Sequence, residues 1–116
     1  MIHRVRTRAE FDLIGRRGRR VRNDLLWCSH LHDPTIRPAR VAFAIGRAHG
    51  SAVERNRLRR RLRAALREQA SLGTLAPGLY LMGIERSMSE RALRVPGPEL
   101  TERVVDLMSR LAGRDR

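Results

Sequence analysis

Lysine is absent from this 116-residue chain, and aromatic residues make up only 3% of it. The scarcity of aromatic residues leaves Leu, Val, Ile and Ala to fill a core. A single cysteine, Cys28, allows neither an intramolecular disulfide nor a thiolate metal site, so we expect a reducing, cytoplasmic environment. No apolar run approaches the roughly 20 residues that span a bilayer, and residues 1–6 lack a signal-peptide segment, so no membrane partner is expected.

Acidic residues are also few, with 12 Asp and Glu against 25 basic residues, and the formal net charge is +13. A polyanion is therefore the expected partner. Every basic residue is Arg, whose planar fork suits contacts with phosphates and base edges. The length fits one compact domain, which we place at residues 1–116.

The first half of the chain predicts one helix followed by two strands. Residues 7–10 form a capping-box pattern, which opens a short helix that ends near Gly18. Residues 25–31 have the composition of a strand, and the two prolines within residues 32–38 end it. Apolar residues alternate over residues 39–45, which predicts a second strand in an antiparallel pair.

The second half predicts a loop at residues 46–50 and a capping box at residues 51–54 that opens the longest helix. A strand at residues 79–84 is apolar on both faces and is therefore expected at the centre of the sheet. An amphipathic helix reaching Leu111 closes the domain, and residues 113–116 are expected to be a frayed tail. The order α-β-β-α-β-α predicts an α+β fold, a single-domain sandwich with helices packed on a small mixed sheet, in which a strand-helix-strand unit can be parallel.

The longest helix carries seven arginines between residues 55 and 67. Like charges at helical spacing repel and so destabilise the isolated helix. A bound polyanion would reverse that loss of stability. A solvated, merely solubilising face is the alternative, but such faces usually mix charges of both signs. If about five phosphate contacts form, the log–log salt dependence of binding should have a slope on the order of −4. Asn56 either bonds the local backbone at the helix start, reads RNA edges or orders a metal-bound water.

The helical segment resembles the signature of the bacterial ribonuclease P protein family, which is carried here by Arg55-Asn56-Arg57 followed by Leu58, Arg59, Arg60, Leu62 and Arg63. The preceding residues 46–54 are similar to the family's glycine-containing basic loop. Residues 8–11, 18–20 and 77–80 extend the match over nearly the whole chain. Two departures are that Ile14-Gly15 replaces a frequent second aromatic and that Arg47 replaces a common Lys.

The resemblance implies a left-handed crossover between parallel strands and the role of protein subunit in ribonuclease P, a hydrolase and endonuclease of tRNA processing. Its catalytic RNA would bind the chain and, with Mg²⁺, remove the 5′ leader of precursor tRNA. The residues expected to contact RNA are Arg47, Arg55, Asn56, Arg57, Arg59, Arg60, Arg63 and Arg67. The resemblance also implies a leader cleft between the sheet and the first helix, lined by Phe11. Trp27 and Phe43 are further stacking candidates there, with a place in the core as the alternative for each.

No catalytic or metal-binding residue is expected in the chain itself. Its carboxylates are scattered without the paired spacing that cages two metal ions, and His30 and His32 are more typical of surface or core residues than of ligands. The rival function is a non-catalytic RNA-binding module, similar to a ribosomal protein or an RNA chaperone. A DNA-binding helix-turn-helix protein is a weaker rival, because a strand and a glycine loop precede the basic helix where a second helix would be needed.

Overall fold

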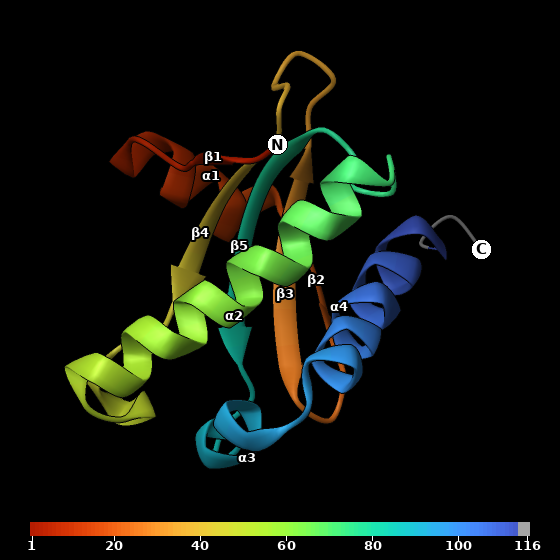
Figure 1. Ribbon diagram of the computed structural model, residues 1–116. Helices are drawn as coiled ribbons and strands as arrows, with labels where there is room; N and C mark the ends of the chain where they lie inside the picture. The colour runs from red at the N-terminus through yellow and green to blue at the C-terminus, as the bar shows by residue number, and fades with distance from the viewer. Residues whose placement is uncertain (114–116) are drawn as a thin grey trace.

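A computed structural model describes residues 1–113 of the chain, which form one five-stranded sheet with helices on both faces (Figure 1). The strands are β1 (His3–Arg4), β2 (Arg19–Arg22), β3 (Leu26–His32), β4 (Arg40–Ala44) and β5 (Gly78–Ile84). The helices are α1 (Arg8–Arg17), α2 (Ala52–Ser71), α3 (Ser89–Arg94) and α4 (Gly97–Ala112), with a 3₁₀ turn, η1, at Arg47–His49. The predicted α+β class is confirmed. Within residues 1–113, no helix combines the length and the hydropathy needed to cross a bilayer.

The strands lie in the order β1-β4-β5-β3-β2, with β5 at the centre as predicted. β5 pairs with β3 antiparallel and with β4 parallel. The predicted antiparallel pairing of the strand at residues 39–45 is therefore wrong. Alternating hydrophobicity shows which face of a strand is buried but not which strand lies beside it, and β5 separates β3 from β4 here.

The β4-α2-β5 unit crosses over with left-handed sense. In Figure 1, β4 and β5 both point down, α2 lies in front of the sheet, and the chain moves from β4 to β5 toward the right. With the strands turned to point up, the same step runs to the left. This crossover is an exception to the right-handed rule, which holds in about 98% of such units.

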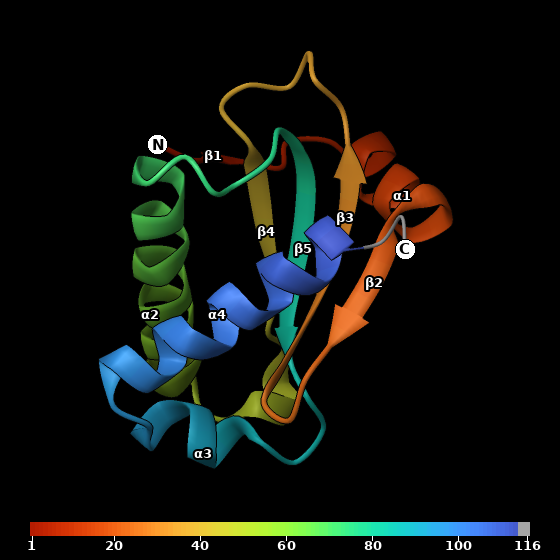
Figure 2. The same ribbon diagram turned by 90° about the vertical axis from the view of Figure 1, so that its right-hand side faces the viewer.

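The two faces of the sheet are covered unequally (Figure 2). α2, α3 and α4 lie on one face, and α1 lies on the other. The main hydrophobic core fills the space between the sheet and the larger helical layer, where Tyr80, Met82, Leu62 and Leu107 are almost fully buried. At about 25 cal/mol per Å² of buried apolar surface, this aliphatic layer is the principal source of stability.

The local signals at helix starts are confirmed. The side chains of Thr7 and Ser51 each accept a hydrogen bond from the backbone of a Glu three residues later, and each Glu returns the bond. The sequence reading missed β1, β2 and α3, which are short and rich in arginine or polar residues, and it missed η1 within the predicted loop. The tail expected at residues 113–116 lies, apart from Gly113, outside the described residues.

Candidate nucleic-acid interface

α2 is anchored by one buried stripe, which leaves its other faces to arginine. Leu58, Leu62 and Leu66 are almost fully buried against the core, and Ala65 and Gln69 complete the stripe. The remaining faces carry the seven arginines predicted from the sequence. The apolar stripe therefore fixes the rotation of the helix and the side from which each arginine projects.

The start of α2 presents the most open part of the predicted RNA-binding set. Asn56, Arg57 and Arg60 are exposed, as is Arg47 in η1. Arg55 is half-buried, and its Nε is a buried donor that has no hydrogen-bond acceptor within residues 1–113. These side chains give the helix start a positively charged surface that phosphates can approach.

Arg59 links the helix start to the end of β4. It donates hydrogen bonds to Asn56 Oδ1 at 3.0 Å and to the carbonyl oxygen of Ile45 at 2.8 Å. Asn56 is exposed and accepts this bond within its own helix. These bonds hold the loop after β4 and the first turns of α2 in one fixed relation.

Arg61 differs from the exposed Arg57 and Arg60 because it binds the neighbouring helix. It donates hydrogen bonds to the carbonyl oxygens of Ala92 and Val95, at the end of α3. Burial and the nearby charge of Arg57 lower the pKa of Arg61. The sequence reading did not include Arg61 in the RNA-binding set, and its spacing from Leu58 and Ala65 is the signal that places it beside the core.

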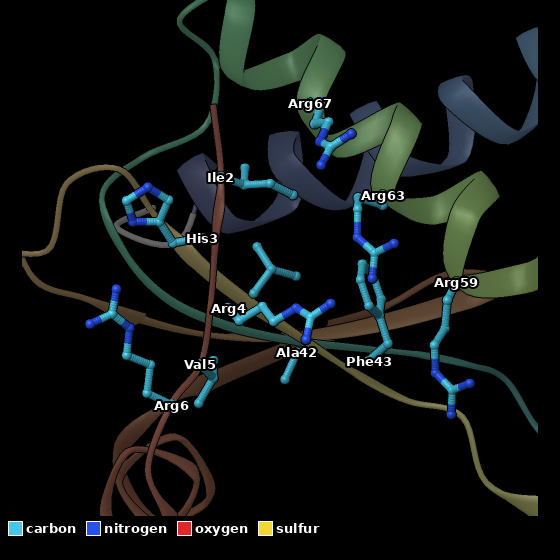
Figure 3. A pocket seen from close by; sticks show the side chains of 11 residues that line it. Ile2, His3, Arg4, Val5, Arg6, Ala42, Phe43, Arg59, Arg63 and Arg67 are labelled. Carbon is cyan, nitrogen blue, oxygen red and sulfur yellow. The ribbon is translucent and has the colours of Figure 1, made fainter. Parts of the chain in front are cut away.

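A basic groove separates α2 from β1 (Figure 3), and we call it the β1–α2 groove. Its lining consists of Ile2, His3, Arg4, Val5, Arg6, Val41, Ala42, Phe43, Arg59, Arg63 and Arg67. Arg4 points from β1 toward Arg63 and Phe43, whereas His3 and Arg6 point away from them. The Arg63 guanidinium lies over the Phe43 ring, 5.6 Å from its centroid. Arg4 was absent from the predicted RNA-binding set, because the short strand that carries it has no sequence signal.

The opposite sheet face carries Trp27. The Arg20 guanidinium stacks 4.0 Å from the centre of the Trp27 ring, and Arg20 Nε donates to Ser29 Oγ at 3.2 Å. Gly83 is paired with Trp27 across the strands, and a Cβ atom at Gly83 would lie 2.5 Å from the indole. Because Gly83 has no side chain, the Trp27 indole can pack directly against its backbone.

α1 packs on the same face as Trp27. Glu10 of α1 forms an ion pair with Arg40, which alternates with Val41 and so lies on the face away from the main core. Phe11 is also on α1 and is 42% exposed. Phe11 therefore belongs to the helix that covers the sheet face of Trp27, and a leader cleft lined by the two rings stays a prediction.

Phe43 does not join them. It is paired with Met82, which faces the main core, and it lies beneath Arg63 of α2. The expectation that Phe43 shares a cleft with α1 therefore does not match this geometry, because residue alternation turns its ring to the opposite face. Phe43 belongs instead to the β1–α2 groove.

The described acidic side chains are mostly engaged with arginine. Glu10 pairs with Arg40, and Asp24 pairs with Arg91 and Arg103. Within residues 1–113, no group of three or more His, Cys, Asp or Glu side chains is placed to hold a metal ion. Cys28 is completely buried, and burial raises the pKa of its thiol to about 12, so it remains protonated at neutral pH. Among the described residues, the side chains therefore offer arginine cations rather than a metal-ligand cluster or a thiolate.

Comparisons with known proteins agree with this picture. The sequence model of the family described as Ribonuclease P matches residues 2–111. The ribonuclease P protein component of Symbiobacterium thermophilum is 37% identical over 108 residues, which cover 93% of this chain and 90% of that protein. The ribonuclease P protein of Thermotoga maritima has a similar structure, with a TM-score of 0.80 and 25% identity over 93% of this chain and 96% of that one. The Staphylococcus aureus protein, 16% identical, shares the fold with a TM-score of 0.77 over 96% and 95% of the two chains.

Proposed function

Because this chain belongs to the ribonuclease P protein family, we propose that its two surfaces have separate RNA partners. The family supplies the protein component of a ribonucleoprotein endoribonuclease that acts in tRNA 5′ processing. In our proposal the α2 surface binds the catalytic RNA. The sheet face beside α1 holds the single-stranded 5′ leader of precursor tRNA.

One observation carries the proposal for α2. Within residues 1–113, the ion pairs involve arginines outside α2, namely Arg22, Arg40, Arg91, Arg94, Arg103 and Arg110. None of the arginines predicted to bind RNA takes part in one. A helix whose arginines are not paired with carboxylates is stabilised when a polyanion binds, since each phosphate removes repulsion between guanidinium groups.

The leader site is supported by the Arg20–Trp27 pair. A nucleobase can stack on an indole or on a guanidinium plane, and such stacking contributes roughly 1–3 kcal/mol per base. Ser29 fixes the Arg20 plane over the ring, so the platform is already ordered. Phe11 provides a further exposed ring on the α1 side.

The protein contributes binding and charge neutralisation rather than chemistry. Mg²⁺ would be held by the catalytic RNA, since within residues 1–113 no three His, Cys, Asp or Glu side chains are placed together to hold a metal ion. Bound there, the metal would supply activation of the hydrolytic water and stabilisation of the leaving oxygen. The arginines hold the two RNAs together by neutralising their phosphates. The proposed place of this assembly is the cytoplasm.

The test is cleavage of precursor tRNA by the catalytic RNA at low Mg²⁺ concentration, with and without this protein. Stimulation is expected, and an Arg57→Ala, Arg60→Ala double variant should lose most of it. The matched control is Arg94→Ala, Arg110→Ala, which removes two exposed arginines from α3 and α4 and should keep the stimulation. RNA binding without stimulation would favour a non-catalytic RNA-binding module instead.

The leader site has its own readout, because Trp27 is the only tryptophan. Precursor tRNA should change Trp27 fluorescence more than mature tRNA does. Gly83→Ala should displace the indole and reduce the difference. Equal responses to the two tRNAs would refute the leader assignment while leaving the α2 surface untouched.

A further inference from the structure

The β1–α2 groove brings together arginines that are far apart in the sequence. Arg4 is paired with Val41 in the parallel β1–β4 ladder, so it lies on the sheet face that α2 covers. Arg63 and Arg67 face it from α2 (Figure 3). Phe43 lies beneath Arg63 and limits the directions in which that guanidinium can turn.

These cations repel one another in the structure as described. Among residues 1–113, no carboxylate lines the groove, and Arg4, Arg63 and Arg67 take part in no ion pair. Burial, together with the charges of Arg4, Arg67 and Arg59, lowers the pKa of Arg63. The repulsion opposes the docking of β1 beside the helix.

β1 itself is weakly held. It has two residues, and its flanking hydrogen bonds run from His3 N to Ala39 O at 2.8 Å and from Val5 N to Val41 O at 3.3 Å. Ile2 adds an apolar contact at the edge of the core. A terminal strand with so few bonds opens at a small free energy, so a local ligand can change its population measurably.

We infer that the β1–α2 groove is a phosphate-binding site in which Arg4 closes over the backbone of an RNA strand against Arg63 and Arg67. A phosphate between Arg4 and Arg63 replaces repulsion with two charge-assisted contacts. Arg59, Arg63 and Arg67 follow one another at rises of about 6 Å along α2, a row that extends beyond a single phosphate and favours a polymer. Only the identity of the occupant rests on the proposed function. The closure of β1 on the anion is a separate claim.

Amide hydrogen exchange tests this inference on the full chain. The amides of His3 and Val5 report β1 docking, and the amide of Met82 in the central strand reports global stability. The ligands are inorganic phosphate and a short single-stranded RNA, each at about ten times its Kd. Exchange at His3 and Val5 should slow about tenfold with RNA, since a ligand bound only to the closed state multiplies its population by 1 + [L]/Kd.

Arg4→Gln should abolish this slowing at His3 and Val5 and reduce the salt slope of RNA binding by about 0.7. The matched control is Arg8→Gln, which removes one exposed arginine from α1, on the other face of the sheet. Protection by RNA in the wild type and in Arg8→Gln, but not in Arg4→Gln, supports the inference.

Three outcomes overturn it. Protection of His3 and Val5 by inorganic phosphate but not by RNA would rule out RNA as the occupant. Slowing at Met82 without slowing at His3 and Val5 would show that RNA binds the folded protein without closing β1, since a ligand bound only to the closed state slows all three amides alike. Unchanged exchange at His3 and Val5 would show that no anion binds there. Cleavage is not measured, so failure here leaves the proposed function standing, and loss of cleavage stimulation would leave the groove standing.

Discussion

Arg60 and Arg61 are neighbours in sequence with opposite predicted roles, and replacing each by Ala removes the same charge. Arg60 is exposed, whereas Arg61 is half-buried and bonded to two carbonyl oxygens at the end of α3. Truncating Arg61 leaves both acceptors without their charged donor, which should cost about 1.5–2 kcal/mol and lower Tm by roughly 6–10 °C. Truncating Arg60 should change stability by less than about 0.5 kcal/mol.

In RNA binding the order of the two variants should be reversed, with Arg60→Ala having the larger effect. Arg60→Ala should reduce the log–log salt slope by about 0.7–0.9, the value of one phosphate contact, and Arg61→Ala should leave the slope nearly unchanged. Urea unfolding followed by circular dichroism gives the stability, and fluorescence anisotropy of labelled ribonuclease P RNA over a salt series gives the slope. Equal destabilisation by the two variants, or a larger slope change for Arg61→Ala, would refute the division of roles along α2.

Three further predictions concern the scaffold. Cys28 should not react with a thiol reagent such as DTNB in the native protein at pH 8 but should react fully in urea, because its thiol is buried with a pKa raised to about 12; rapid native labelling would contradict this. Gly78→Ala should destabilise the fold by more than about 2 kcal/mol in urea unfolding, since Gly78 has φ 128° and a Cβ would lie 2.1 Å from Leu31 O; a neutral effect would show that β5 can shift. Partial burial alone would raise the pKa of Glu10, but bonds from the Arg6 and Thr7 amides and from Arg40 lower it below the usual 4.5. The bonds of the Glu10 carboxylate therefore stabilise the fold above that pH, and this stabilisation is lost as the pH falls through the lowered pKa. Glu10→Gln should lower the free energy of unfolding by about 1 kcal/mol at pH 7 and weaken its decrease at acid pH. An unchanged decrease at acid pH would exclude the Glu10–Arg40 pair as its cause.

Elements with strong local signals were predictable from the sequence. The capping boxes at Thr7 and Ser51 and the apolar stripe of α2 each depend on residues within a few turns of one another, so the helices could be located without tertiary knowledge. The central position of β5 followed from its apolar composition on both faces. The strand neighbours did not follow, because pairing of β5 with β3 and β4 is a long-range choice that no local pattern encodes.

The site was predictable as a set of charges but not as an arrangement. The spacing of Arg61 from Leu58 and Ala65 sets it beside the apolar stripe, but the bonds that separate it from Arg60 are made to α3, which the sequence reading missed. Arg4 had no signal, since a two-residue strand has no periodicity. The faces of Trp27 and Phe43 depend on the register of β3 and β4 against β5, which sends one ring toward α1 and the other toward α2.

The central place of β5 also sets the timing of folding during synthesis. β3 and β4 are made first, yet neither pairs with the other, and both wait for a strand that follows the whole of α2. At 5–20 residues per second, a ribosome takes about 2–7 s to add residues 52–84. Until β5 has been made, the β2–β3 and β1–β4 pairs cannot join, so the sheet that supports the arginine-rich helix closes only after the whole of that helix has been synthesised.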